Sequence, residues 1–287
     1  MTVRPSGDLG ALAEVAAVAL DFDPADAHDA HALVARLSAP PSGRVWTSLA
    51  SDDGLVFASL SGKDPTVGHI DLIGVRPEAR GRGLGTRLVR AAEEWLRDHG
   101  AEQGRFAGNP PCYAWPGIDV RATPAVCLAE SLGYERYHAA WNMTADLAAD
   151  LGVEAELARL AEAGVTVRSA APGERAQVVA FAREHWKETW AWEAEHATGC
   201  HYAVRGDEVI GFAVWGSRPS WFGPTGTAAA ARGLGVGRVL LRRCLAEQRD
   251  SGLTAAQIAW VGPLRFYARA VGARVERVFW LYRRDLR

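Results

Sequence analysis

Short segments in which apolar and polar residues alternate recur along the chain, and this alternation predicts strands. Residues 44–50 and 55–60 show it, and the turn-forming sequence DDG at residues 52–54 predicts a hairpin between them. A third apolar segment, residues 68–75, leads into a glycine-rich sequence. After the glycines, residues 86–92 carry apolar side chains at helical spacing. The pattern therefore predicts a hairpin, a third strand, a glycine loop and a helix in succession.

The same succession occurs again in the second half of the chain. Residues 201–204 and 209–215 predict a second hairpin, and the sequence ARGLGVG at residues 231–237 matches ARGRGLG at residues 79–85. Residues 238–244 then repeat the amphipathic helical pattern. Self-similarity along a chain indicates repeated structural units. We therefore expect two copies of one α/β domain, each with a mixed, mostly antiparallel sheet flanked by helices.

The chain of 287 residues is long enough for two domains of ordinary size. We place an N-terminal domain at residues 1–147 and a C-terminal domain at residues 164–287. Residues 148–163 have helical periodicity and predict a helical linker between them. We assign the final strand of each domain to its own half, starting near residue 133 in the first and near residue 272 in the second.

Composition narrows the class of protein. The chain is 48% hydrophobic and 23% charged, and no apolar run is long enough to cross a membrane, so we expect a soluble, cytoplasmic protein without a membrane partner. Its N-terminus lacks the basic and apolar pattern of a secretory signal. The net charge of -2 gives no indication of a nucleic-acid partner. Four cysteines without C-x-x-C spacing indicate reduced thiols, and we expect no metal site.

The two glycine sequences have the context of an anion-binding loop. A strand that delivers glycines to a helix N-terminus directs several backbone N–H groups at one point, where the helix dipole also favours negative charge. Nearby arginines offer charge-assisted hydrogen bonds to phosphate. The Walker A loop is excluded because neither copy has the required lysine. The dinucleotide fingerprint is excluded because its sixth position is Thr86 in one copy and Arg238 in the other.

The remaining pattern, [Q/R]-x-x-G-x-[G/A], is met at residues 80–85 and again at residues 232–237. It resembles the coenzyme A loop of the GNAT superfamily of N-acetyltransferases, and the resemblance extends over nearly the whole chain. A glycine-rich turn with a purely structural role is the alternative for either copy alone. The resemblance implies that acetyl-CoA is a co-substrate, held by Val75, Arg80, Gly81, Arg82, Gly83, Leu84, Gly85, Thr86, Arg232, Gly233, Leu234, Gly235, Val236, Gly237 and Arg238.

The resemblance also implies a mechanism in which an amine attacks the thioester directly, without a metal ion. Such a reaction needs a general base for the amine and an acid for the departing thiolate. Tyr267 matches the position of the thiolate acid in this family, and the alternative is a core tyrosine. The first half has Ala129 at the matching place. We therefore expect the second half to carry the chemistry.

Three residues are candidates for the general base. His69 and Asp71 alternate along one face of the third strand, where the alternative is an ordinary solvated strand face. Glu193 follows Trp186 and Trp190 at helical spacing, and we expect all three on one face of one helix. The alternative is that the tryptophans form part of the core.

Two further segments leave alternatives open. Residues 113–119 form an aromatic turn that is either a lid or a packing element. Residues 221–227 contain glycines and a proline where the first half has alternating aliphatic residues, which indicates either a reshaped acyl pocket or a weakened coenzyme site.

The sequence thus predicts an acyl-CoA-dependent N-acetyltransferase that acts on the primary amine of a small molecule. The alternative is an acyl-CoA sensor or a structural pseudoenzyme without turnover. The pattern specifies neither the amine nor the length of the acyl group, nor the oligomeric state.

Overall fold

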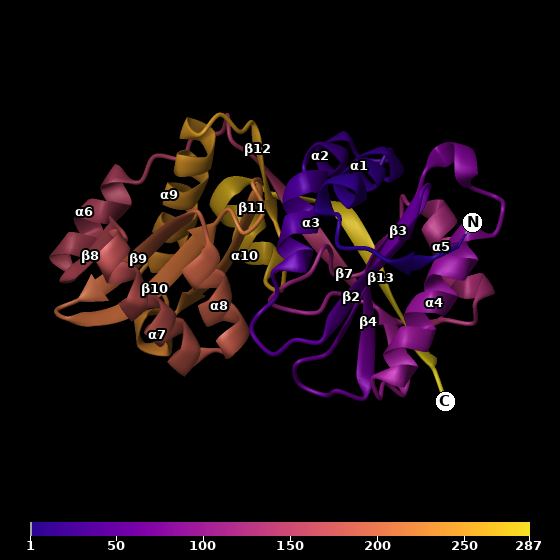
Figure 1. Ribbon diagram of the computed structural model, residues 1–287. Coiled ribbons are helices and arrows are strands. Elements are labelled where there is room, and N and C mark those ends of the chain that lie inside the picture. Colours follow the sequence, from indigo (N-terminus) through magenta and orange to yellow (C-terminus); the bar gives the residue numbers. More distant parts are fainter. Residues whose placement is uncertain (1) are drawn as a thin grey trace. The chain divides into compact units, whose positions relative to one another are not determined.

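The computed structural model describes residues 2–287, which form two compact units (Figure 1). Unit 1 consists of Met1–Ala140 together with Arg277–Arg287, and unit 2 of Trp141–Glu276. Chain order had led us to assign the last strand to the C-terminal domain. Most of that strand instead belongs to unit 1, because its hydrogen-bonding partner is a strand of the first half.

The strands of unit 1 pair antiparallel, except that β4 (Val67–Val75) and β5 (Gln103–Phe106) pair parallel. The strand β13 lies next to β5 and pairs Tyr282 with Phe106. The short strand β6 (Ile118–Asp119) pairs with β13. In spatial order the sheet contains β1 (Arg4–Pro5), β2 (Trp46–Ser51), β3 (Gly54–Leu60), β4 (Val67–Val75), β5 (Gln103–Phe106) and β13 (Arg274–Asp285).

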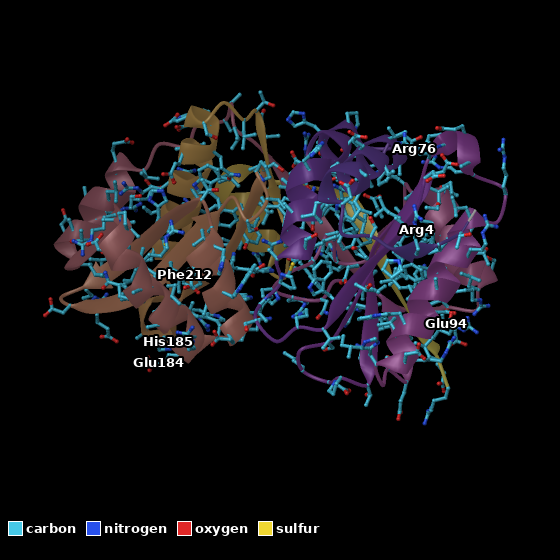
Figure 2. The ribbon with its side chains drawn as sticks, in the orientation of Figure 1. Arg4, Arg76, Glu94, Glu184, His185 and Phe212 are labelled. Atoms are coloured by element: carbon cyan, nitrogen blue, oxygen red, sulfur yellow. The ribbon has the colours of Figure 1, made fainter. Side chains whose placement is uncertain are left out.

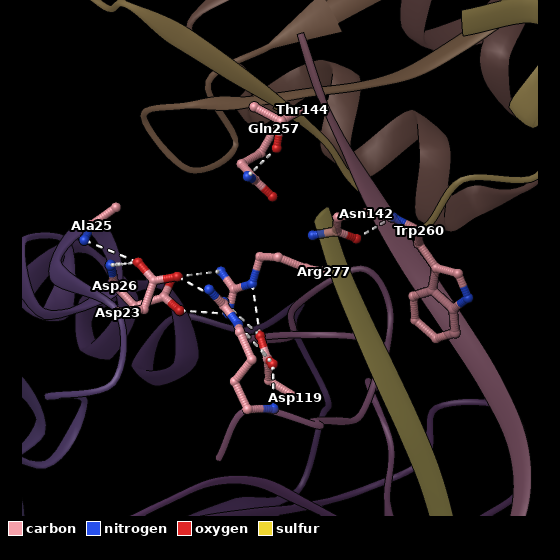
Figure 3. A network of polar contacts seen from close by, with 10 residues as sticks. Asp23, Ala25, Asp26, Asp119, Asn142, Thr144, Gln257, Trp260 and Arg277 are labelled. Atoms are coloured by element: carbon pink, nitrogen blue, oxygen red, sulfur yellow. Dashed lines mark hydrogen bonds and ion pairs between the residues drawn. The ribbon is translucent and has the colours of Figure 1, made fainter. Parts of the chain in front are cut away.

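The sheet of unit 2 repeats this arrangement, with its single parallel pair between β11 and β12. Next to β12 lies β7, which is fixed there by side chains as well as by the ladder (Figure 3): Asn142 accepts from the backbone N–H of Trp260 at 2.8 Å, and Gln257 donates to Thr144 at 3.0 Å. In spatial order the sheet contains the C-terminal part of β7 (Glu135–Asp146), then β12 (Ala255–Ile258), β11 (Trp221–Thr227), β10 (Glu208–Trp215), β9 (Gly199–Arg205) and β8 (Val165–Ser169).

Helices cover both faces of each sheet, so each unit has two hydrophobic clusters. In unit 1, α1 (Leu9–Ala19) and α3 (Ala30–Ser38) cover one face, and α4 (Leu84–Asp98) with α5 (Thr123–Ser131) covers the other. In unit 2, α7 (Arg175–His185) and α8 (Glu188–His196) lie opposite α6 (Glu154–Glu162), α9 (Val236–Asp250) and α10 (Leu264–Val271). The expected fold class is confirmed.

Part of the segment predicted as a helical linker is helical. Within residues 148–163, only Glu154–Glu162 form the helix α6, and its Leu160 is buried in the core of unit 2. Among residues 2–287, no helix has the length and apolar surface that a membrane crossing requires.

A buried ionic network holds the last strand in unit 1 (Figure 3). Arg277 of β13 is 4% exposed and donates to Asp26 at 2.6 Å and to Asp119 at 2.9 Å. Arg121 donates to Asp119 and to Asp23, both at 2.8 Å. Asp23 also caps the N-terminus of the short helix α2 (Pro24–His28). Charges removed from water are tolerated when they are paired in this way.

We expect Arg277→Ala to destabilise unit 1 by about 3–5 kcal/mol, because it leaves two buried carboxylates without their shared partner. The measurement is the free energy of unfolding in urea, followed by tryptophan fluorescence. Arg274→Ala is the control on the same strand, because the Arg274 side chain is 81% exposed and its ion pair with Glu276 is 4.0 Å long. Equal losses in the two variants would contradict a structural role for the network.

Candidate functional site

The glycine loop of unit 1 connects β4 to α4. A 3₁₀ turn (Pro77–Ala79) follows the strand, and Gly81 and Gly83 then adopt φ of 73° and 76°. A Cβ on Gly81 would meet no atom within 4 Å, so the requirement for glycine there is conformational rather than steric. Within residues 2–287, the backbone N–H groups of residues 82–85 find no protein acceptor. They are the unpaired donors of a helix start, which suit an anion.

The loop of unit 2 has the same conformation. Its 3₁₀ turn is Ala229–Ala231, and Gly233 and Gly235 have φ of 85° and 93°. Gly235 immediately precedes α9, as Gly83 immediately precedes α4. The prediction of a glycine loop at a helix start in both halves is confirmed.

Arg80 holds the first loop in place. Its guanidinium donates to the carbonyl oxygens of Val75 and Ala19, both at 3.0 Å, and pairs with Asp21 at 2.9 Å. These bonds join the loop to the end of β4 and to the end of α1. Arg82 is exposed beside it. The sequence grouped both arginines as coenzyme ligands, but the contacts of Arg80 within the protein are structural.

A cavity of about 380 Å³ opens where β4 separates from β5. Along β4 the pairing with β3 runs from Gly68 to Val75, whereas the pairing with β5 is confined to Val67, Gly68 and His69. The far part of β4 therefore presents one edge without a neighbouring strand. The cavity is lined by residues 73–75 of this strand, by the glycine loop, and by the ends of α1 and α5, including Ala19, Leu20, Asp21, Phe22, Gly81, Gly83, Leu84, Gly85, Thr86, Pro124, Ala125 and Leu128.

A smaller pocket of about 80 Å³ adjoins this cavity, and the two share part of their lining. Its walls are mainly apolar and aromatic, and the aromatic turn of residues 113–119 supplies Trp115 and Gly117 to them. That turn is therefore part of a pocket wall. Two carboxyl groups, those of Asp71 and Asp119, also line the pocket. The shared lining consists of Leu20, Phe22, Ile73, Ala122 and Ala125.

Asp71 is the extra residue of a β-bulge in β4. Ala58 pairs with Ile70 and Phe57 with Leu72, so Asp71 has no opposite residue on β3. Ser59 donates to its Oδ2 at 2.6 Å, while Oδ1 is buried and without a hydrogen-bond partner among residues 2–287. Burial raises the pKa of Asp71 to about 7, against the opposing effects of the Ser59 hydrogen bond and the positive charge of Arg44. Such a carboxyl group is suited to accept a proton near neutral pH.

His69 is a structural residue by its surroundings. It is 6% exposed, and its Nδ1 lies 2.9 Å from the carbonyl oxygen of Ala107. Burial lowers the pKa of His69 to about 4, so the ring is neutral near pH 7. The idea of a solvated strand face is wrong for His69, which is buried, while Asp71 is partly buried and lines a pocket.

Tyr267 and Glu193 both lie in unit 2. Tyr267 of α10 is 7% exposed and packs edge-on against Phe222 and Phe266, and burial raises its pKa to about 12. Glu193 of α8 is 8% exposed. Their assignment as catalytic residues stays a prediction.

The prediction of one helix carrying Trp186, Trp190 and Glu193 is wrong. Helix α7 ends at His185 and α8 begins at Glu188, so Trp186 lies in the break between them. The indoles of Trp186 and Trp190 still stack, with ring centroids 5.6 Å apart. Beside them lies the buried Phe212, which is labelled in Figure 2. The stack belongs to the hydrophobic cluster beneath α7 and α8.

Trp186 also marks a difference between the two units. Its ring lies against Gly226, the residue before the end of β11, so closely that a Cβ there would overlap the indole. Gly74 has the same place near the end of β4, where a Cβ would lie 2.9 Å from the Cβ of Ala19. Unit 2 thus has an indole where the cavity wall of unit 1 has a methyl group.

A family model described as "Acetyltransferase (GNAT) family" matches residues 15–111 and 170–273 of the chain. The chain belongs to the GNAT family of acetyltransferases. The two matched regions lie one in each half of the chain, so the protein is a tandem GNAT.

Curated relatives bear a consistent name. A mycothiol acetyltransferase from Thermomonospora curvata is 28% identical, over 76% of this chain and 74% of the relative. One from Thermobispora bispora is 37% identical over 82 residues, 29% of this chain and 24% of the relative. The aligned part of this chain thus spans about a quarter of that relative's length.

Solved structures share the GNAT fold over the whole chain. A tandem GNAT protein from the clavulanic acid biosynthesis pathway has a TM-score of 0.72 at 17% identity, covering 100% of this chain and 98% of its own. A GCN5-related N-acetyltransferase from Sphaerobacter thermophilus has a TM-score of 0.67 at 23% identity, covering 100% and 96%. At these identities the likeness concerns the fold alone.

We expect Gly83→Asp to weaken coenzyme A binding to the GNAT loop of unit 1, and Gly235→Asp to do so in unit 2. Each change places a side chain and a negative charge at the helix start that would receive the diphosphate. Calorimetry gives affinity and stoichiometry. Gly100→Asp controls for backbone strain, because Gly100 has φ of 90° at the other end of α4. Unchanged binding in both loop variants would refute the assignment of the loops.

The raised pKa of Asp71 predicts a stability change of defined sign. Because folding favours the neutral form, the stability that Asp71 contributes is present at low pH and is lost as pH rises through about 7. Asp71→Asn should therefore raise the melting temperature by a few degrees at pH 8, and much less at pH 4. Calorimetric melting curves at both pH values test this. An equal change at the two pH values would show that Asp71 has an ordinary pKa.

Proposed function

We propose that unit 1 transfers an acetyl group from acetyl-CoA to the primary amine of a small molecule, with Asp71 as general base. The observation that carries this proposal is that Asp71, whose buried Oδ1 has no hydrogen-bond partner among residues 2–287, lines a pocket that adjoins the cavity of the glycine loop. A basic atom, a place for an amine and a place for a thioester thus adjoin one another, as proximity catalysis requires.

The residues around the larger cavity fit acetyl-CoA. The unpaired amides of residues 82–85 at the start of α4 suit its diphosphate. The unpaired edge of β4, where Ile73, Gly74 and Val75 line the cavity, offers backbone groups to the amides of the pantetheine arm. The coenzyme supplies the thioester and the thiolate leaving group.

Asp71 provides the proton acceptor for the amine. The ammonium form of the substrate first gives one proton to Asp71 Oδ1. The nitrogen then forms a bond to the acyl carbon and releases its second proton to solvent, while the carbon–sulfur bond breaks with its electron pair going to sulfur. The thiolate takes its proton from solvent. Losing the proton to Asp71 makes the nitrogen lone pair available for attack, so the carboxyl group has to be ionised beforehand.

The small pocket favours a compact primary amine. Its volume of about 80 Å³ holds only a few atoms, and its walls include Trp115, Phe106 and Phe22. Asp119 is already paired with Arg277 and Arg121, so Asp71 is the carboxylate with an oxygen left for an ammonium group. The names of the relatives make the acceptor of mycothiol acetyltransferases the first amine to test.

We assign the chemistry to unit 1 rather than to unit 2, where Tyr267 had led us to expect it. Two observations support the assignment. Trp186 covers the end of β11, and Tyr267 is packed into the core of its unit. Gly233 and Gly235 nevertheless keep the loop conformation of unit 2.

Asp71→Asn should lower kcat by about 10²–10⁴ and leave the affinity for acetyl-CoA nearly unchanged, because it removes the base without altering the loop. In the unaltered protein, kcat/KM should fall as pH drops through about 7, since protonated Asp71 cannot accept the amine proton. The assay is release of free thiol from acetyl-CoA with a panel of amines.

The same assay separates the alternatives. Full activity in Asp71→Asn with a large loss in Tyr267→Phe would place the chemistry in unit 2. Binding of acetyl-CoA without thiol release for any amine would favour a sensor or a structural pseudoenzyme.

A further inference from the structure

Two buried polar residues, Asn109 and Ser59, form a hydrogen-bonded chain to Asp71. Asn109 lies in the segment after β5 and is 3% exposed, and Ser59 lies on β3 and is 4% exposed. Asn109 Nδ2 donates to Ser59 Oγ at 2.8 Å, and Ser59 Oγ donates to Asp71 Oδ2 at 2.6 Å. The chain ends at the carboxyl group whose other oxygen is free.

The direction of these hydrogen bonds is fixed by a backbone carbonyl. Asn109 Nδ2 also lies 3.1 Å from the carbonyl oxygen of Leu60, which can only accept. The atom of Asn109 that faces Leu60 is therefore the nitrogen, and its two hydrogens go to Leu60 and Ser59. Because Ser59 Oγ receives one of them, its own hydrogen is directed to Asp71 Oδ2.

We propose that Asn109 and Ser59 are positioning residues that reserve Oδ1 of Asp71 as the oxygen that takes the proton of the amine. A proton on Oδ2 would face the hydrogen of Ser59. Ser59 could accept that proton on its second lone pair only by turning its own hydrogen away from Asp71, where that hydrogen finds no other acceptor among residues 2–287. The proton is therefore favoured on Oδ1, on the residue that lines the acceptor pocket. This inference rests on the proposed function of Asp71 as the base.

The segment that carries Asn109 is itself fastened to the strands. Arg44 donates to the carbonyl oxygens of Asn109 at 2.7 Å and Pro110 at 2.8 Å. His69 is joined to Ala107 in the same segment. These contacts hold Asn109 at hydrogen-bonding distance from Ser59, so the hydrogen-bonded chain is formed before any substrate binds. This also gives the buried His69 a role in the site without contact to substrate.

The titratable groups that face Asp71 keep the same charge near neutral pH, whereas Asp71 itself titrates there. Arg44 stays charged because a guanidinium does not lose its proton in this range. The pKa of His69, lowered by burial to about 4, keeps that ring neutral. Burial alone would raise the pKa of Asp119, but hydrogen bonds from Arg121 and Arg277 lower it, so Asp119 is ionised. A shift of the acidic limb of activity therefore reports on Asp71.

The test is the pH profile of kcat/KM in Ser59→Ala. Loss of the hydrogen bond from Ser59 removes an interaction that lowers the pKa of Asp71, so the acidic limb should move up by about one pH unit. Activity should fall about tenfold well below the limb and recover at pH 9. Ser59→Thr keeps the hydroxyl and should keep the profile. Ser61→Ala is the control, because its hydroxyl contacts only the nearby Lys63 backbone in the described chain.

Asn109→Ala tests the second link of the chain. It frees Ser59 to rotate, so the limb should move in the same direction by a smaller amount. Because Asn109 acts through Ser59, the double variant should match Ser59→Ala alone. Additive pKa shifts in the double variant would contradict the proposal that Asn109 acts through Ser59. A uniform loss of activity without a shift of the pH profile would also contradict it, because that result indicates a merely structural role.

A titration of the Asp71 carboxyl carbon by NMR makes the inference independent of turnover. The midpoint should rise in Ser59→Ala and stay in place in Ser59→Thr and Ser61→Ala. An unmoved midpoint in Ser59→Ala overturns the positioning role even if the enzyme is active. If no amine is acetylated but the midpoint rises, the hydrogen-bonded chain holds and the proposed function of Asp71 fails.

Discussion

The early end of the pairing between β4 and β5 is the constraint on which the site depends. Backbone N–H and C=O groups inside a protein need partners, and beyond His69 one edge of β4 has no strand to provide them. The cavity lies along this edge, where the proposed coenzyme would offer amides of its own. The bulge at Asp71 interrupts the ladder on the other side of the same strand. In the proposed mechanism, this one irregular strand supplies both the groove for the coenzyme and the carboxyl group for the amine.

The wall of this site is held by the far end of the chain. Asp119 lines the small pocket and Arg121 the larger cavity, and both belong to the buried network of Arg277. The network removes the charges of Arg277, Asp26 and Asp119 from water, which is tolerable only because each carboxylate has an arginine partner. It also pairs the negative charge of Asp119 with two arginines. Asp71 is therefore the pocket carboxylate that can take a proton. The same buried network therefore stabilises unit 1 and keeps Asp119 paired with arginines.

The two units keep the same loop and differ in what packs beside it. The glycine conformations agree within about 20° in φ at both positions, so the anion-binding feature is common to both. The neighbouring side chains differ: Ala19 in unit 1 and Trp186 in unit 2 lie against equivalent glycines of the strand. A methyl group leaves room beside the strand, whereas an indole fills it. The duplicated fold therefore presents one open cavity wall and one covered strand end.

The sequence by itself determined the features that depend on neighbours in the chain. The succession of strand, glycine loop and helix is a local property, and the duplicated sequence predicts it in both halves. The tertiary structure alone decided the rest. It paired β13 with β5, broke the expected helix at Trp186, and placed Asp71 in a bulge of β4 that alternation cannot reveal. It also brought Asn109 to Ser59, fifty positions away, because hydrogen-bond partners and pKa values are set by burial and by contacts distant in sequence.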